Sequence, residues 1–524
     1  MSEVICCLVL LMDVVLLIQM IVSRLMRLIA SDFITQYRPH PCDLRVWLRH
    51  RGEPEHEATE YELVLRRLGD RHEHEHLATL GECLNLSGVA EDERIQRTAD
   101  AIARRISVIY QPAFRVTHRF GEIDVEIVGL PDFLILDGDR YIVRDAKMAR
   151  RIDEDNHPEI LLQVQLYGWL FQRSIGSPPK ALQVFSGMKK IVPIAYDGGA
   201  EALTALEHVV AIKRSQEEAY EPVGWSKCGP CGYSERCWNR AETNGDVALI
   251  PDVDQNIARK LGEIGVRSCK ELLSKFDASS LSELKRPFGD GQRRVGSRAD
   301  RILKFAESIE QRTERILAVP AIPQFPNYVM LDFEGMPPHL DELDKIYLWG
   351  LQVFGDKPSE FMPAVSGFGV NGDREGWLAF LHNAKRIFES YGDILFVHWA
   401  SYEKTYLVKY MQRYGDPDGV AARVMTNLLD LLKVTQKSII LPVPSFSLKV
   451  IEQYVGYTRK QAEYGGQWAM AMFIEMTETD DEERRKGLMD EILAYNQEDL
   501  EATWAVFQWL QSKTGEIISA PQAS

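Results

Sequence analysis

The sequence predicts two α/β domains that are joined by a helical linker. Three observations support this organisation. Helical periodicity gives way to short β-type runs within the first 240 residues, and the pattern becomes helical from about residue 250 to residue 310. After the proline-rich stretch 319–326, a second set of strands is followed by helices. A chain of 524 residues can build about two to four domains, each with its own hydrophobic core.

The first domain is expected to begin with helices and to continue as a sheet. Residues 26–50 predict a helical opening, and Ser31 and Asp32 are available to cap it. Two further helical segments are expected at residues 59–86 and 91–107. Strands are then expected at residues 108–116, 121–127, 133–136, 141–143, 180–185 and 191–196, and helices at 159–173 and 200–220.

The linker and the second domain follow a different order. Residues 250–310 are predicted to be helical throughout, and residues 258–266 resemble a helix-hairpin-helix segment, whose glycine turn places backbone N–H groups against phosphates. A plain helical linker is the alternative. In the second domain, strands are expected at residues 328–334, 345–354 and 394–398, and helices at 376–391, 402–413, 421–430, 447–455 and 484–512.

The charge of the chain excludes one class of function. A formal net charge of −16 argues against a passive nucleic-acid coat, because such a protein would be basic overall. It does not exclude a nuclease, since metal sites use carboxylates and a local basic groove is enough for backbone contact. One basic stretch, residues 285–301, is either such a groove or a solvated helix face. Its cations are Lys285, Arg286, Arg293, Arg294, Arg298 and Arg301.

The N-terminal 25 residues have three interpretations. Residues 4–22 are almost continuously apolar, and their length fits a transmembrane helix or an uncleaved signal anchor. Asp13 lies near the middle of this run, where it would make insertion costlier by roughly 2.5–3.5 kcal/mol. Met26 begins a segment that is typical of a natural protein start, so a misplaced start codon is the second interpretation, and a soluble helix is the third. We expect a cytoplasmic protein, with a membrane partner only if residues 1–25 are genuine.

A first set of chemical side chains lies on the predicted strands of the first domain. Asp132 directly precedes an apolar strand, and Asp145 ends the next strand. Lys147 follows at i+2, so its side chain and that of Asp145 point to the same face of that strand. Two carboxylates can hold Mg²⁺ or Mn²⁺, and the lysine can position water or balance negative charge on a phosphate. The pattern predicts a metal-dependent hydrolytic site.

Four of the eight cysteines form a candidate ligand set. Cys228, Cys231 and Cys237 have the spacing Cys-x-x-Cys-x5-Cys, and Cys42 lies far upstream. Zinc and a [4Fe–4S] cluster both take four thiolates, and either would close a long loop whose entropy is otherwise unfavourable.

Together these residues resemble the RecB-type branch of the PD-(D/E)XK nucleases, and most closely its iron–sulfur members, over roughly residues 26–240. The resemblance implies a restriction-endonuclease-like fold and a [4Fe–4S] cluster, with zinc as the alternative. Asp132 and Asp145 would be metal ligands, Lys147 the catalytic lysine, Gln163 and Tyr167 the RecB-specific helix motif, and His72 or Glu73 an additional metal ligand. The family often has Glu where this chain has Asp145.

A second set lies in the second domain. Asp332 and Glu334 share one strand face at i and i+2. Tyr495 and Asp499 share one helix face, since they are one turn apart. Glu403 begins a helix directly after a predicted strand. The arrangement predicts another carboxylate site for divalent metal ions.

This second set resembles the RNase H-like 3′–5′ exonucleases of the DEDD superfamily, Tyr subtype, over roughly residues 325–512. In that family two metals bridge the scissile phosphate, held mainly by the first and last aspartates, here Asp332 and Asp499. Tyr495 would orient the attacking water. The family usually has Asp where this chain has Glu403.

The combined interpretation is a metal-dependent nuclease that acts on nucleic acid, with single-stranded DNA ends as the expected substrate, in repair, processing or defence. The expected parts are an N-terminal extension (1–25), a RecB-like PD-(D/E)XK domain (26–245), a helix-hairpin-helix-like linker (246–318) and an RNase H-like domain (325–515). No Walker loop is present, so any helicase would be a separate chain. The alternative is a nucleic-acid-binding scaffold in which one or both sites are degenerate.

Overall fold

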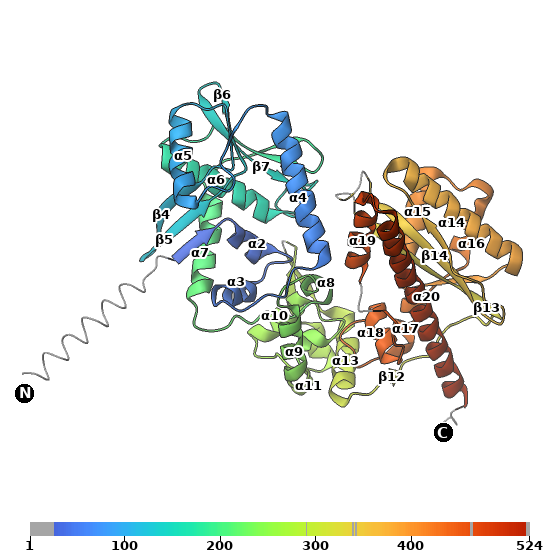
Figure 1. Ribbon diagram of the computed structural model, residues 1–524. Helices are drawn as coiled ribbons and strands as arrows, with labels where there is room; N and C mark the ends of the chain where they lie inside the picture. The colour runs from blue at the N-terminus through green and yellow to red at the C-terminus, as the bar shows by residue number, and fades with distance from the viewer. Residues whose placement is uncertain (1–25, 290, 338–339, 341–342, 462–464, 520–524) are drawn as a thin grey trace, which may run out of the picture. The chain divides into compact units, whose positions relative to one another are not determined.

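The computed structural model describes residues 26–289, 291–337, 340, 343–461 and 465–519 (Figure 1). The expected N-terminal extension therefore lies outside the described residues. Two compact units are distinguished. Unit 1 comprises the chain up to Pro54 together with residues 68–219, and unit 2 comprises residues 55–67 together with the chain from Tyr220 onward. Within the described ranges, no helix is both long enough and apolar enough to cross a membrane.

The strands of unit 1 form two mixed sheets. They are β1 Met26–Ile29, β2 Leu84–Asn85, β3 Val108–Tyr110, β4 Phe114–Phe120, β5 Ile123–Gly129, β6 Phe133–Asp137, β7 Arg140–Lys147, β8 Ala181–Ser186 and β9 Ile191–Ile194. The larger sheet has the order β2-β3-β6-β7-β8-β9, and the smaller one has the order β1-β5-β4. In the larger sheet β6 and β7 are antiparallel neighbours, and β7 is parallel to β8.

Helices cover these sheets, and one of them, α6, is buried along most of its length. The helices are α2 Ser31–Tyr37, α3 Asp43–His50, α4 Glu60–Thr79 (whose first residues belong to unit 2), α5 Glu91–Ala103, α6 Pro158–Ile175 and α7 Ala200–Arg214. α6 packs closely on β5, because a Cβ at Gly129 would lie 2.4 Å from the Cδ1 of Leu170. Glycine in β5 therefore allows α6 to reach the sheet.

The opening of the chain differs from the helix that the sequence predicts over residues 26–50. Residues Met26–Ile29 form a strand that pairs in parallel with β5, and Leu28 is its buried residue. Helices α2 and α3 follow, separated by a stretch that contains Pro39 and Pro41. Proline lacks the backbone N–H that a continuing helix needs, so one long helix does not form. The strand is stabilised by a distant partner, which local periodicity does not reveal.

The first part of unit 2 is mainly helical, but it contains a β-hairpin. Its helices are α8 Trp225–Cys228, α9 Ser234–Asn244, α10 Gln255–Glu263, α11 Cys269–Lys275, α12 Ala278–Ser282 and α13 Ala299–Gln311. Strands β10 Lys285–Phe288 and β11 Gly291–Arg294 pair antiparallel, so the prediction of helix throughout residues 250–310 was wrong here. Gly289, with a φ of +54°, lies in the turn between the two strands, a conformation that glycine adopts readily.

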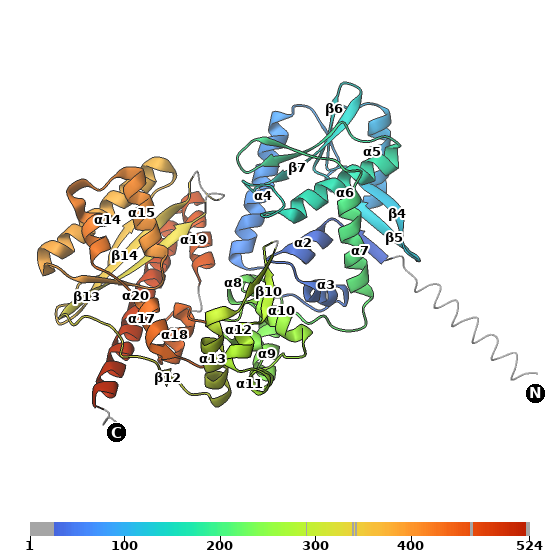
Figure 2. The same cartoon turned by 180° about the vertical axis from the view of Figure 1, so that it is seen from behind.

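The second part of unit 2 is a five-stranded mixed sheet with helices on both faces (Figures 1 and 2). Its strands are β13 Asn327–Met336, β14 Lys345–Gly355, β15 Met362–Val365, β16 Leu395–His398 and β17 Leu428–Asp430, in the order β15-β14-β13-β16-β17. Alternate residues of β13 face opposite cores: Val329 and Leu331 belong to one buried cluster, and Tyr328 and Met330 to another. β13 is therefore the central strand, and its side chains reach both faces.

The helices of this part are α14 Gly369–Tyr391, α15 Tyr402–Tyr414, α16 Val420–Thr426, α17 Leu431–Ser438, α18 Leu448–Tyr454, α19 Gly466–Glu478 and α20 Glu482–Ser519. A short ladder, β12 Arg315–Ile316 with β18 Ile439–Ile440, completes the strands of unit 2. The helix predicted over residues 421–430 ends at Thr426, because Leu428–Asp430 pairs in parallel with β16 as an edge strand. The sequence did not predict α17, α19 or β15.

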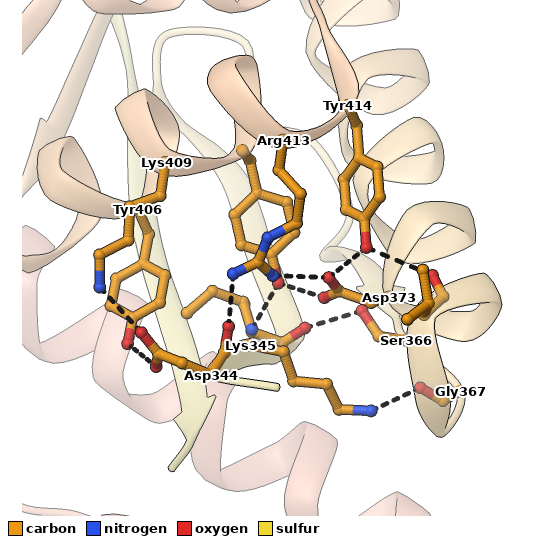
Figure 3. Close-up of polar contacts among 12 residues, drawn as sticks. Asp344, Lys345, Ser366, Gly367, Asp373, Tyr406, Lys409, Arg413 and Tyr414 are labelled. Carbon is orange, nitrogen blue, oxygen red and sulfur yellow. Dashed lines mark hydrogen bonds and ion pairs between the residues drawn. The ribbon is translucent and has the colours of Figure 1, made fainter. Parts of the chain in front are cut away.

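A buried polar network fixes the start of β14 against α14 and α15 (Figure 3). The fully buried Asp373 of α14 accepts hydrogen bonds from Tyr410, Arg413 and Tyr414 of α15. The Tyr410 hydroxyl in turn accepts a bond of 2.7 Å from the backbone N–H of Ile346. Ile346 pairs with Gly335, directly after a register shift that follows Glu334. The network therefore holds β14 at the point where β13 presents its carboxylates.

Candidate active sites

In unit 1, Asp132 and Asp145 lie side by side where β6 begins and β7 ends. Asp145 Oδ1 accepts from the backbone N–H of Asp132 at 3.3 Å, and Asp132 Oδ2 accepts from the backbone N–H of Ala146 at 2.8 Å. Lys147 Nζ lies 2.6 Å from Asp145 Oδ2, which places both side chains on one face of β7. The antiparallel pairing of β6 with β7 thus joins three predicted site residues.

Two residues extend this group, and the sequence identified only one of them. Gln111 donates from Nε2 to Glu73 Oε1 at 2.6 Å and to Asp132 Oδ1 at 3.0 Å. Gln111 has a φ of +55°, which is unusual for a residue other than glycine. His72 instead lies against Phe185, with Nε2 3.2 Å from its carbonyl oxygen and the two rings 4.7 Å apart. Of the two alternatives for an upstream ligand, Glu73 is the one connected to the carboxylates.

The predicted helix motif lies on α6. Gln163 donates from Nε2 to the Tyr167 hydroxyl at 2.7 Å, and both side chains are buried. Gln163 Oε1 has no hydrogen-bond partner among the described residues. Burial and the nearby Asp145 raise the pKa of Tyr167 far above its usual value, so its hydroxyl stays protonated. This helix therefore contributes the unpartnered Gln163 Oε1 and the Tyr167 hydroxyl, and the charges of Asp145 and Asp132 act on that hydroxyl.

The charges of the unit 1 site are strongly coupled. Burial, followed by repulsion from Asp145, raises the pKa of Asp132 well above its usual value. Burial opposes the charge of Lys147, but the attraction of Asp145 and Asp132 outweighs it and raises the lysine pKa. The lysine is therefore a permanent cation within this group of acids. It offsets part of the negative charge of the carboxylates, which a bound metal ion would otherwise have to neutralise alone.

In unit 2, Asp332, Glu334 and Asp499 meet between β13 and α20. Each offers one oxygen, and the three oxygens all lie within 4.8 Å of one another. Within the part of the chain that the structure describes, this is the only group of three or more such ligands at this spacing. Three oxygen ligands at this distance suit a hard divalent cation such as Mg²⁺ or Mn²⁺.

Asn496 holds one of these carboxylates, and the sequence analysis did not assign it a role. Its Nδ2 donates to Asp332 Oδ2 at 2.7 Å, and the side chain is fully buried. A Cβ at Gly350 on β14 would lie 1.9 Å from Asn496 Oδ1. Glycine at position 350 is therefore required for Asn496 to occupy this place. Asn496 lies one turn from Asp499, and Gly350 pairs with Asp332 across the sheet. These two residues could have been predicted to act together only if the strand register had been known.

Arg459 holds another carboxylate, and it too was missed. Its guanidinium donates to Asp499 Oδ1 at 2.5 Å and to both oxygens of Glu452, at 2.7 and 2.8 Å. The Arg459 side chain is only 11% exposed, so this charge is screened little by solvent. Because Arg459 lies in a loop 40 residues before Asp499, no periodic pattern links the two.

Glu403 lies near this site but outside the three-carboxylate group. Its Oε2 is 3.0 Å from His398 Nδ1, and both side chains are almost fully buried. Tyr495 is buried on α20, with the Lys449 Nζ 5.9 Å from its ring centroid. Burial and the negative charge of Asp499 raise the pKa of Tyr495 well above 10, so its hydroxyl is a donor rather than a base.

The electrostatics of the three carboxylates fit a bound cation. Burial, then the charge of Asp499, raises the pKa of Glu334 to about 8, and burial with the charges of Asp499 and Glu334 raises the pKa of Asp332 well above its usual value. Such shifts arise because buried like charges repel, and a divalent ion would remove that repulsion. Several polar atoms around the carboxylates have no hydrogen-bond partner among the described residues: Tyr347 Oη, Arg459 Nη1, Asn496 Oδ1 and Glu498 Oε2. The residues present therefore fit a metal ion and a polar substrate.

The four candidate thiols are divided between the units. Cys228 and Cys231 are buried and Cys237 is partly buried, all in unit 2, whereas Cys42 precedes α3 in unit 1. Burial, with Cys231 and Cys237 nearby, raises the pKa of Cys228 to about 11. A metal or cluster would have to displace that proton, since thiolates are the ligands.

Comparisons with known proteins agree with both folds. Residues 44–238 match the family model of the PD-(D/E)XK nuclease superfamily, and residues 329–511 match that of the RNase_H superfamily. The chain joins a PD-(D/E)XK domain to an RNase H-like domain. These assignments confirm the predicted fold class, and they support a metal-dependent nuclease. Among curated proteins, none matches the sequence significantly.

Two solved structures are similar to parts of the chain. One is the protein SSO0001, with 17% identity and a TM-score of 0.20, covering 33% of this chain and 96% of its own. The other is a candidate exonuclease from Eubacterium rectale, with 14% identity and a TM-score of 0.22, covering 38% of this chain and 90% of its own. Likeness at this level carries no argument about activity, which depends on the two sites.

Proposed function

We propose that this chain is a metal-dependent exodeoxyribonuclease that hydrolyses phosphodiester bonds at single-stranded DNA ends. The observation that carries the proposal is the group Asp332, Glu334 and Asp499, whose oxygens lie within 4.8 Å of one another inside a segment that matches RNase H-like proteins. A bound Mg²⁺ or Mn²⁺ would polarise the scissile phosphate and lower the pKa of a coordinated water.

The chain's own residues would position the reactants at this site. Asp332 and Asp499 would hold the metal ions, and Glu334 would share that role. Asn496 donates to Asp332 and Arg459 donates to Asp499, so each contact would restrict the rotation of its carboxylate before metal binds. The Tyr495 hydroxyl would orient the attacking water by hydrogen bonding, consistent with its raised pKa. Glu403 would not bind the metal directly. Held by its contact with His398, it would add negative charge near Asp332 and Glu334.

The unit 1 site is proposed as a second catalytic centre of RecB type. Asp132, Asp145 and Glu73 would supply metal ligands, and Lys147 would stabilise negative charge on the phosphate. Gln163 and Tyr167 would act from α6 as the helix motif of the site, where Gln163 Oε1 is an acceptor without a hydrogen-bond partner among the described residues. His72 would have a packing role, given its contact with Phe185.

We also propose that Cys42, Cys228, Cys231 and Cys237 hold a [4Fe–4S] cluster, with zinc as the alternative. The proposed domain limits are 26–245 for the RecB-like part, 246–318 for the linker and 325–515 for the RNase H-like part. A separate helicase would supply unwinding. The cluster is tested by anaerobic purification, absorption near 400 nm and metal analysis: a colourless protein that contains zinc would favour the alternative.

The experiment that tests the proposed activity compares four proteins with labelled DNA and Mn²⁺. They are the wild type, Asp145→Asn, Asp499→Asn and the matched control Asp490→Asn, which changes an exposed acid on the same helix as Asp499. Cleavage of linear but not circular single strands, lost in one of the site variants and kept in the control, would support the proposal. No metal-dependent cleavage of DNA by the wild type would favour a binding scaffold, and cleavage of RNA alone would overturn the choice of substrate.

A further inference from the structure

The β10–β11 hairpin of unit 2, whose first strand is labelled in Figure 2, carries exposed cations in a chain that is otherwise acidic. Lys285, Arg293 and Arg294 are exposed on it, although the chain as a whole has a formal charge of −16. Among the residues that the structure describes, no carboxylate forms an ion pair with Lys285 or Arg293, and Arg294 pairs with Glu283 at 3.0 Å. In sequence, residues 285–294 contain four cations and one acid, so this segment carries a net positive formal charge.

The hairpin also exposes an aromatic ring, and two guanidinium groups lie near it. Phe288 is 53% exposed. The register pairs Arg286 with Arg293 and Phe288 with Gly291, so these side chains share one face of the ladder. The guanidinium carbons of Arg286 and Arg293 lie 5.3 and 5.1 Å from the Phe288 ring centroid. Such cation–π contacts favour one position of the ring, and about half of the side chain remains exposed.

The base of the hairpin is anchored, so the exposed part is presented on a fixed support. Arg286 is buried and pairs with Asp254, the N-cap of α10, at 3.0 Å. The N–H of Val295, directly after β11, donates to the carbonyl of Leu284, directly before β10, at 2.9 Å. Because these two contacts fix the base of the hairpin, less of it has to become ordered when a ligand binds.

We propose that the β10–β11 hairpin binds a single-stranded segment of nucleic acid, with an unpaired base on Phe288 and a backbone phosphate on Arg293 of the same face, while Lys285, on the opposite face of the ladder, adds to the positive charge that attracts the strand. This inference rests on the proposed function, because it gives the substrate of the same chain a second contact. An open ring can stack only on a base that is not already stacked within a duplex, which selects single strands. Neighbouring cations attract phosphate without reading sequence, so the contact should be insensitive to base identity.

The test measures binding without cleavage. Fluorescence anisotropy with a labelled oligothymidylate of about 20 nucleotides, a length that spans typical single-strand sites, is recorded in EDTA with the full chain. Phe288→Ala should weaken binding by about 10-fold, the order expected for loss of one stacked base. Lys285→Glu with Arg293→Glu should weaken it further and reduce its dependence on salt concentration.

The matched control is Lys357→Glu with Arg374→Glu, which makes the same charge change at exposed positions elsewhere in unit 2. It should bind like the wild type. Unchanged affinity in the hairpin variants would overturn the inference, as would equal losses in the control pair. Variants that lose affinity for anionic vesicles or acidic peptides but keep it for the oligonucleotide would overturn it as well.

A separate assay distinguishes failure of the hairpin from failure of the proposed function. Hydrolysis of a p-nitrophenyl thymidine monophosphate ester by the wild type with Mn²⁺ needs no extended strand. If the wild type hydrolyses the ester but the hairpin variants bind the oligonucleotide as tightly as the wild type, only the proposed role of the hairpin is refuted. Hairpin-dependent binding without any hydrolysis of ester or DNA would refute only the nuclease proposal.

Discussion

The stability of the metal-free protein should fall as pH rises from about 5 to 8, because Glu334 is forced to ionise inside unit 2. Burial and the charge of Asp499 raise the pKa of its carboxyl from 4.5 to about 8 in the folded protein. Between these two values the folded chain holds a proton that the unfolded chain has released. The unfolding free energy therefore decreases with pH across this window and levels off above it.

The size of the effect follows from the shift. A difference of about 3.5 pH units corresponds to roughly 5 kcal/mol, with a slope of at most about 1.4 kcal/mol per pH unit for one proton. Asp332 has a pKa shifted in the same direction and would add to the slope. Bound Mn²⁺ should abolish most of the loss, since it holds the carboxylates in their charged form.

The assay is hydrogen exchange of β13 and α20 in EDTA at several pH values, corrected for intrinsic exchange, because the chain has two units and a single melting temperature would mix them. Glu334→Gln removes the titrating group, so the slope of the unfolding free energy against pH should decrease by the amount expected for about one proton. The reasoning is refuted if the wild-type protection of these elements is constant or rises from pH 5 to pH 8, or if Glu334→Gln retains the full slope.

Three further predictions concern single side chains. Gly350→Ala should displace Asn496 and lower the Mn²⁺-dependent rate by about 10–100-fold with the fold intact, as measured by steady-state kinetics and circular dichroism; a rate equal to wild type would contradict the need for glycine. Lys147→Met leaves Asp145 buried without its cation, so unit 1 should lose about 3–5 kcal/mol of stability, seen in its hydrogen exchange, unless Mg²⁺ is added. Arg459→Lys cannot keep the forked contact and should weaken Mn²⁺ affinity by about 10-fold, measured by calorimetry, whereas unchanged affinity would show that the guanidinium has no positioning role.

Local spacing was sufficient to predict the residues that share one element. Asp145 and Lys147 are two residues apart on β7, and the structure joins them at 2.6 Å. Asp332 and Glu334 likewise belong to one group on β13. In both cases the two-residue period of a strand places the two side chains on the same face, so the sequence alone is enough to predict that each pair lies together.

Residues that support these groups from elsewhere in the chain could not be predicted in the same way. Gln111 reaches Asp132 because β3 and β6 are neighbours, and Arg459 reaches Asp499 from a loop. The same limit applies to β1 and β17, whose short segments become strands only beside their partners. These contacts and strands depend on which strands lie next to each other in the sheet. The periodicity of a single sequence does not predict that order.

The two sites differ in how their charge is balanced, and this difference bears on how strictly each depends on metal. In unit 1 the ammonium of Lys147 lies 2.6 Å from Asp145 and remains charged at any ordinary pH. In unit 2 Arg459 divides its hydrogen bonds between Asp499 and Glu452, and among the described residues no ion pair joins a cation to Asp332 or Glu334. The unit 2 site therefore needs external positive charge before its acids can all ionise. Removal of divalent ions should consequently loosen β13 and α20 more than β6 and β7.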